Sequence, residues 1–231
     1  NKDEPLLEAF PMADPSHYLL NSGYEQTKWV SECLLAEAHR RGFSVNIFRL
    51  GWIGPQSKTG ICSPNNNHFL LFMKGCIQLD SAPNRNNYIE IVPVDIASKI
   101  IVNLSLIHTG QVFHISSNSV IAWAKLIDWI NEAGYQVKLV PPVTWHQKYL
   151  THIDKNNALY PFLPLYNAGD TPVDWLSLYE NLPKIETQHT SAILKSLGIS
   201  YPCFSKGTFF TYLHYLQNSG FLKEPTTSNF N

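Results

Sequence analysis

The stretch GYEQTKWVSECLL, residues 23–35, decides how the rest of the chain is interpreted. Its apolar residues recur at helical spacing, which predicts an α-helix. Tyr24 and Lys28 are four residues apart, so their side chains lie on one helix face, one turn apart. A lysine ammonium beside a tyrosine stabilises the phenolate, so the pair suits a reaction in which a carbonyl oxygen gains charge and is protonated. By itself this spacing more often marks a surface pair on an amphipathic helix.

Two longer strings carry a resemblance that the spacing alone does not. GYEQTKWVSECLLAEAHRRG (residues 23–42), followed by VNIFRLGWIG (residues 45–54), resembles the thioester reductase family. These are the terminal reductase domains of nonribosomal peptide and polyketide synthetases and of carboxylic acid reductases. The Y-x-x-x-K pattern of Tyr24 and Lys28 resembles the active-site helix of the wider short-chain dehydrogenase/reductase superfamily. Shorter matches at SKTG, MKGCIQL and VPVD extend the resemblance over nearly the whole chain.

The order of elements predicts an α/β fold followed by a mainly helical part. A short β-rich run at residues 44–50 follows the first helix after Gly42, which is typical of the αβ unit of a parallel sheet. With the resemblance, we expect the C-terminal part of a Rossmann-like extended short-chain dehydrogenase/reductase. Residues 1–118 would belong to the NAD(P)-binding domain, with a substrate-side insertion at 57–88, and residues 119–231 would form the helical substrate domain.

Hydrophobic spacing and capping residues predict the remaining helices and strands. Asn67 is placed to cap the helix that follows it, and Asp95 is a cap or first-turn acid for the helix after VPVD. Cys33 is expected on the buried side of the first helix. We expect helices at 68–79, 96–107, 120–133, 145–153, 190–197 and 206–218, and strands at 88–92, 111–115 and 136–140.

The loop after the first predicted strand is a candidate for ligand contact. In open α/β sheets, ligands bind beyond the carboxyl ends of the strands, and glycines there let the backbone come close. A plain turn explains this loop about as well. The resemblance implies that the loop borders the nicotinamide and that the next loop begins the substrate side. The implied contacts are Gly51, Trp52 and Ile53 for the cofactor, and Ser57, Thr59 and Gly60 for the substrate.

Composition excludes several other classes of function. The net charge is −1, only 15% of the 231 residues are charged, and no basic run interleaves with aromatic residues, so we expect no nucleic-acid partner. The four cysteines form no C-x-x-C pair, so we expect neither a zinc site nor a disulfide framework. No apolar run approaches the ~20 residues of a membrane span, and we expect a cytoplasmic location without membrane contact.

The resemblance implies a specific reaction and partner. A carrier protein would deliver an acyl or peptidyl thioester on its phosphopantetheine arm, and NADPH would reduce it to an aldehyde, or on to an alcohol. Tyr24 would donate a proton to the developing oxyanion. Lys28 would stabilise the Tyr24 phenolate and hydrogen-bond the nicotinamide ribose. The rival interpretations are another extended family member, such as a nucleotide-sugar epimerase, and a non-catalytic module that docks a carrier protein.

Two parts that this chemistry needs are not found in the sequence. One is the glycine-rich turn that binds the dinucleotide pyrophosphate after an N-terminal strand. The other is the Ser or Thr that precedes the tyrosine in the family resembled, because Ser16 and Ser22 lie in a loop-like stretch. We therefore expect this chain to be the C-terminal part of a longer reductase. NADPH would be bound mainly by residues upstream, and residues 1–231 alone would be inactive.

Overall fold

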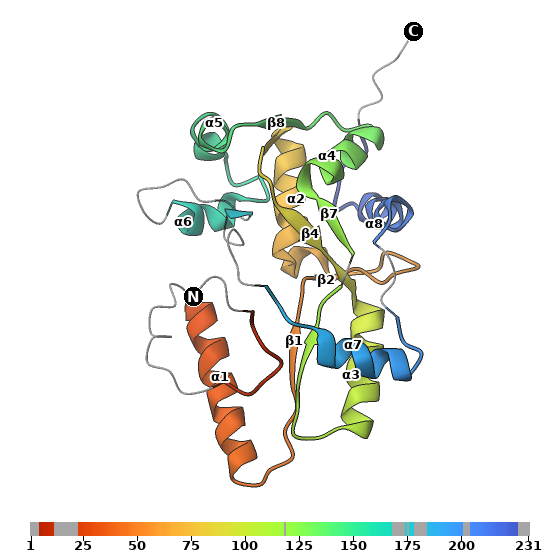
Figure 1. Cartoon of the computed structure of the whole chain (residues 1–231). Helices are drawn as coiled ribbons and strands as arrows, with labels where there is room; N and C mark the ends of the chain where they lie inside the picture. The colour runs from red at the N-terminus through yellow and green to blue at the C-terminus, as the bar shows by residue number, and fades with distance from the viewer. Residues whose placement is uncertain are drawn as a thin grey trace. The chain divides into compact units, whose positions relative to one another are not determined.

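The chain folds into two compact units in the computed structural model. Unit 1 comprises residues 1–53, 92–118 and 183–202, and unit 2 comprises residues 54–91, 119–182 and 203–231. Figure 1 labels most of their helices and strands. The structure describes residues 5–11, 23–117, 119–167, 174, 176–177, 184–200 and 204–225.

Unit 1 is built on a pair of parallel strands with helices alongside. Strand β1 (Ile47–Leu50) pairs with β6 (Val112–Ile115), with Arg49 opposite His114 in the register. All four residues of β6 are buried, as expected for a parallel strand covered on both faces. The short strands β2 (Ile53–Gly54) and β5 (Val92–Pro93) pair next to them.

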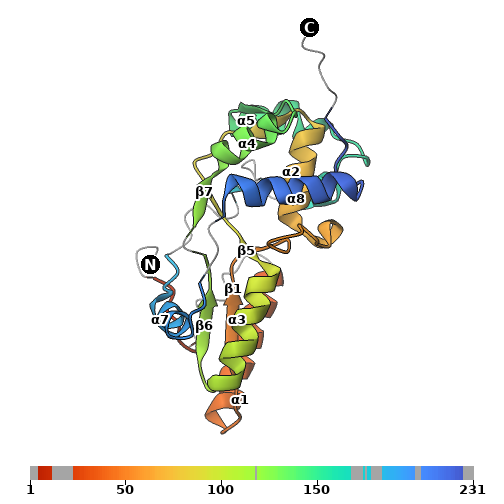
Figure 2. The same ribbon diagram turned by 90° about the vertical axis from the view of Figure 1, so that its right-hand side faces the viewer.

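Three helices complete the described part of unit 1. They are α1 (Gly23–Arg40), α3 (Val94–Ile107) and α7 (Gln188–Ser196). Helices α3 and α7 share one hydrophobic cluster with β6, which includes Ile100, Phe113 and Leu194. Figure 2 shows α3 lying along β1 and β6. This cluster is the apolar core of unit 1, and α1 adds no fully buried residue to it.

Unit 2 combines two short strand pairs with most of the helices. Strand β3 (Ser81–Pro83) pairs in parallel with β8 (Lys138–Val140), and β4 (Tyr88–Glu90) pairs antiparallel with β7 (Val120–Ala122). The α-helices are α2 (His68–Gln78), α4 (Trp123–Glu132), α5 (Pro142–Lys148), α6 (Leu163–Tyr166) and α8 (Lys206–Asn218). Single 3-10 turns occupy Pro64–Asn66, Leu150–His152 and Tyr160–Phe162.

Two buried tryptophans anchor helices of unit 2 to strand β3. The indole N–H of Trp123 donates to the carbonyl oxygen of Pro83 at 2.9 Å, and that of Trp145 donates to Ser81 at 3.1 Å. Both rings also pack against Phe72 of α2, with ring centroids 5.6 and 6.0 Å apart. A buried indole needs a partner for its N–H, and these carbonyls supply it. The tryptophans therefore combine a large apolar contact with a fixed orientation of α4 and α5.

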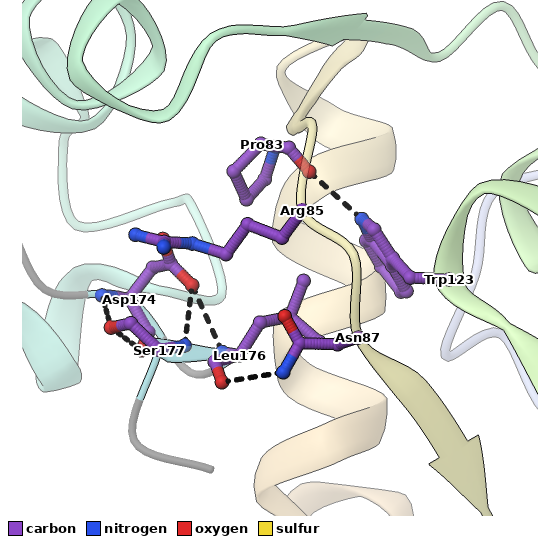
Figure 3. A network of polar contacts seen from close by, with 7 residues as sticks. All are labelled: Pro83, Arg85, Asn87, Trp123, Asp174, Leu176 and Ser177. Carbon is purple, nitrogen blue, oxygen red and sulfur yellow. Dashed lines mark hydrogen bonds and ion pairs between the residues drawn. The ribbon is translucent and has the colours of Figure 1, made fainter. Parts of the chain in front are cut away.

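A second set of contacts in unit 2 joins segments far apart in the sequence (Figure 3). The guanidinium of Arg85 pairs with the buried carboxylate of Asp174 at 2.6 Å. The other oxygen of Asp174 accepts from the backbone N–H groups of Leu176 and Ser177. The amide of Asn87 donates to the carbonyl oxygen of Leu176. Asp174 and Leu176 are thereby held against the segment between β3 and β4.

The structure confirms much of the predicted order of elements and corrects parts of it. Helix 120–133 was wrong at its start, because residues 120–122 form strand β7 and pair with β4. Helix 145–153 was also wrong in extent: α5 begins at Pro142, and a 3-10 turn follows it. The strand expected at 88–92 is divided into β4 and β5. Asn67 does cap α2, accepting from the Leu70 N–H at 3.1 Å.

The expectation of a buried side on the first helix is also corrected. Cys33 is only partly exposed, but no residue of α1 is fully buried, so this helix has no buried side of the kind expected. Residues 183–202 group with unit 1, in which α7 packs on β6. Within the described ranges, no helix is both long and apolar enough to cross a membrane.

Candidate active site

The first turns of α1 bring the two predicted catalytic side chains together. The Nζ atom of Lys28 lies 5.5 Å from the centroid of the Tyr24 ring, which is the cation–π contact expected for residues four apart. Tyr24 is 72% exposed. Among the residues that the structure describes, Lys28 makes no ion pair. The pair is formed within one helix, and its tyrosine is open to solvent.

The loop after β1 is held by the strands on either side of it. The N–H of Gly51 donates to the carbonyl oxygen of Ile115 at 2.9 Å, and the N–H of Val92 donates to that of Trp52 at 2.8 Å. The predicted cofactor loop, Gly51 to Ile53, is therefore fixed between β6 and β5. Because α1 and β1 run in opposite directions (Figure 1), the helix start and this loop lie at the same end of unit 1. That end is where open α/β sheets bind ligands.

A polar cluster ties α1 to the strand pair below the Tyr24–Lys28 turn. Glu32 of α1 receives three hydrogen bonds from the guanidinium of Arg49, at 2.6, 2.9 and 3.0 Å. Arg49 also contacts Nε2 of His114 at 2.9 Å. Burial lowers the pKa of His114 below its ordinary value, which favours the neutral imidazole. Arg49 therefore makes charge-assisted hydrogen bonds to Glu32 on one side and a hydrogen bond to the neutral imidazole of His114 on the other.

The same region receives the N-terminal segment of the chain. The carboxylate of Glu8 accepts from the backbone N–H groups of His189 and Thr190, in the first turn of α7, and from that of His114. It also accepts a hydrogen bond from the Thr190 hydroxyl. Thr187 stands at the cap position of α7 but makes no capping bond through its side chain, so Glu8 performs that function from outside the helix.

Sequence reasoning did not identify Glu8, Glu32, Arg49 or His114. One signal was present: Tyr24, Lys28 and Glu32 continue a spacing of four along one helix face. An acid in that series invites a search for a basic partner on the following strand, where Arg49 lies. No local pattern connects Glu8 with α7, because the two are about 180 residues apart.

The predicted substrate loop lies in unit 2 and is tightly closed. The side-chain oxygen of Gln56 accepts from the N–H groups of Lys58 and Thr59 and from the Thr59 hydroxyl. Gly60 has a φ of +73° and packs directly on helix α8. The structure therefore places Thr59 and Gly60 in a well-defined turn. It describes Ser57 as partly exposed in the same turn.

No metal chemistry is indicated by the described residues. Within those ranges, no group of three or more His, Cys, Asp or Glu side chains is arranged to hold a metal ion. A nicotinamide dinucleotide is the cofactor that the fold implies, and the end of unit 1 has groups that fit part of it. Lys28 has an ammonium with no ion-pair partner among the described residues, and a glycine at position 51 would let the backbone come close to such a group.

Comparisons with known proteins point to one group of reductases. An NAD-binding family model described as male sterility protein matches residues 6–101. L-2-aminoadipate reductase of Schizosaccharomyces pombe is 32% identical over 236 residues, which cover 94% of this chain and 16% of that protein. A polypeptide of the linear gramicidin synthase of Brevibacillus parabrevis is 27% identical over 89% of this chain and 4% of its own length.

A comparison with solved structures points to the same kind of domain. The terminal R domain from the myxalamid PKS-NRPS biosynthetic pathway superposes with a TM-score of 0.84 at 27% sequence identity. The match covers 97% of this chain and 56% of that domain. The chain thus spans a small part of the curated relatives and slightly more than half of the solved reductase domain.

Proposed function

Given that this chain is a relative of the terminal reductase domains of peptide and polyketide synthetases and of L-2-aminoadipate reductases, we propose that it forms part of a thioester reductase. The reaction is the NADPH-dependent reduction of a thioester held on a carrier protein. The products are an aldehyde and the free thiol of the carrier arm. The relatives support a reductase role, and the thioester substrate, NADPH and the carrier protein are our proposal.

Tyr24 is the proposed proton donor. Bound reduced nicotinamide supplies a hydride to the thioester carbon, and the carbonyl oxygen then carries negative charge. The Tyr24 hydroxyl gives that oxygen a proton, directly or through a water molecule, which yields a hemithioacetal. Breaking its C–S bond, with return of the hydroxyl proton to sulfur, releases the aldehyde and the thiol. The exposed position of Tyr24 on the first turn of α1 lets a substrate reach it.

Lys28 has two proposed tasks. Its ammonium stabilises the phenolate that Tyr24 becomes after proton transfer, because the two groups are adjacent on the helix. The same ammonium donates a hydrogen bond to the nicotinamide ribose, which brings the cofactor to the Tyr24 turn. We propose that the loop after β1, Gly51 to Ile53, borders the nicotinamide; the start of α1 and the end of β1 at one end of unit 1 support this. We also propose that Ser57, Thr59 and Gly60 begin the substrate side and that the protein acts in the cytoplasm.

The observation that carries this proposal is the Tyr24–Lys28 pair, preformed on the relatives' fold and uncommitted to other described charged groups. The test uses the full-length protein with NADPH and an acyl thioester of pantetheine, and follows loss of nicotinamide absorbance. Tyr24→Phe removes the proton donor and keeps the ring. General acid catalysis is worth about 10²–10⁴-fold, so kcat should fall by about that factor.

A second tyrosine provides the matched control. Tyr160 of unit 2 is 46% exposed and has no role in the proposal, so Tyr160→Phe should leave kcat unchanged. Equal kcat values for Tyr24→Phe and the unmodified protein would reject Tyr24 as the acid. A protein that binds carrier protein but never oxidises NADPH would favour the rival function, a docking module.

A further inference from the structure

Helix α1 packs on the rest of unit 1 through half-buried side chains, of which Trp29 is the largest. None of its 18 residues is fully buried, and Val30 and Leu34 are 47% and 67% exposed. Near the end of the helix, the ring of His39 stacks on that of Phe10, with centroids 4.5 Å apart. Hydrophobic packing normally fixes the rotation of a helix on a sheet. Because α1 has only half-buried apolar side chains, polar contacts can add to the fixing of its rotation.

The Glu32–Arg49 pair supplies such a contact in the middle of the helix. The guanidinium binds both carboxylate oxygens of Glu32, with Nε at 2.9 and 3.0 Å and Nη2 at 2.6 Å. Both side chains are about three-quarters buried, at 28% and 25% exposed. A bidentate fork fixes direction as well as distance, unlike a single contact between point charges. It therefore sets both the rotation and the axial position of α1 on β1.

Arg49 is itself held from three other directions. Its Nη1 donates to Nε2 of His114, which lies opposite it in the β1–β6 register, and to the carbonyl oxygen of Leu7. Its Nη2 donates to the carbonyl oxygen of Ala9. The Nδ1 of His114 lies 2.6 Å from the carbonyl oxygen of Glu186 and must be its donor, which leaves Nε2 as an acceptor. The guanidinium has one orientation that satisfies all these partners.

We propose that Arg49 is a positioning residue that places Tyr24 and Lys28 for proton transfer by holding Glu32 on the same helix face. Tyr24, Lys28 and Glu32 succeed one another at intervals of four residues. Glu32 lies about 12 Å along the axis from Tyr24, so a rigid helix transmits any rotation between them. The proposal rests on the function proposed above and adds a residue that touches neither substrate nor cofactor.

The expected effect follows from helix geometry. Side-chain atoms at the helix surface lie about 5 Å from the axis, so a rotation of about 10° moves them by about 1 Å. A misplacement of about 1 Å costs about 10²-fold in rate. Arg49→Met keeps most of the aliphatic stem and removes the fork, so kcat should fall about 10²-fold. KM for the thioester should change little, because Arg49 does not contact it.

The test is a double-mutant cycle in the full-length protein, with kcat as the readout. Activities are measured at saturating NADPH, so that weaker cofactor binding through Lys28 does not affect kcat. In the Tyr24→Phe background the acid is already absent, so adding Arg49→Met should then lower kcat by at most a few-fold. Glu32→Gln, which keeps the shape of the side chain, should reproduce most of the Arg49→Met loss. Arg49→Lys keeps the positive charge but not the two-pronged guanidinium. It should therefore recover only part of the kcat that Arg49→Met loses.

The same helix offers a matched control. Glu37 also receives a bidentate guanidinium, from Arg40 at 2.7 Å, but on the exposed surface of the last turns. Glu37→Gln should leave kcat unchanged. Equal losses from Arg49→Met in the unmodified protein and in the Tyr24→Phe variant would overturn the positioning role. So would normal kcat in a folded Glu32→Gln protein, whereas an unmodified protein without any turnover would instead reject the proposed function.

Discussion

Replacing Gly60 by alanine tests whether the predicted substrate loop is anchored on helix α8. Gly60 has a φ of +73°, and an added Cβ would lie 2.7 Å from the carbonyl oxygen of Thr211 and 2.8 Å from Cβ of Tyr215. Both are atoms on or next to the helix backbone and cannot rotate away. A left-handed conformation costs an alanine about 1–2 kcal/mol, and overpacking costs about 1–3 kcal/mol. Gly60→Ala should therefore lower the free energy of unfolding by about 2–5 kcal/mol.

Gly220, immediately beyond α8 in the same unit, separates the two contributions. Its φ is +71°, but an added Cβ would have nothing within 4 Å. Gly220→Ala should therefore lose only the conformational part, about 1–2 kcal/mol. Urea unfolding of both variants, followed by tryptophan fluorescence, measures the difference. Equal losses for the two variants would refute the contact between the loop and α8. Lost activity in a Gly60→Ala protein of normal stability would instead favour direct contact with substrate.

Three further perturbations give sharp expectations. Lys28→Ala should lower kcat and weaken NADPH binding together, in fluorescence titrations of the full-length protein; normal values of both would leave Lys28 without a catalytic role. Asp174→Asn should cost about 3–5 kcal/mol in urea unfolding, because it removes one partner of a buried ion pair with Arg85. Asp128→Asn, in an exposed pair, should cost less than about 1 kcal/mol, and similar losses would contradict the assigned burial. Burial lowers the pKa of His68 to about 4, so stability should fall as pH falls from about 6.5 to 4, and His68→Gln should reduce that loss.

The parts of the fold that the sequence predicted depend on local patterns. Residues 23–40 form the expected helix, and Asn67 caps α2, because spacing and capping residues act within a few positions. Residues 120–122 were predicted as the start of a helix but form strand β7. They continue an apolar pattern into α4, and only the distant strand β4 turns them into a strand.

In the candidate site, too, the local features could be predicted and the contacts between distant segments could not. The Tyr24–Lys28 pair could be predicted because both residues lie on one helix, and the family resemblance that it carried is confirmed by the comparisons. The partners of Arg49 could not be predicted from the sequence, because they come from separate segments between residues 7 and 114. The assignments of Gly51, Trp52 and Ile53 to the cofactor stay a prediction.

The most direct test of the central claim is the fate of the nicotinamide hydride. The full-length protein is incubated with an acyl pantetheine thioester and NADPH that carries deuterium at the transferable C4 position, and the aldehyde is trapped and analysed by mass spectrometry. We predict that deuterium appears on the aldehyde carbon, together with free pantetheine thiol, and that Tyr24→Phe slows its appearance about 10²–10⁴-fold. Aldehyde without the label, or thioester cleaved to a carboxylic acid, would contradict the claim that this chain belongs to a thioester reductase.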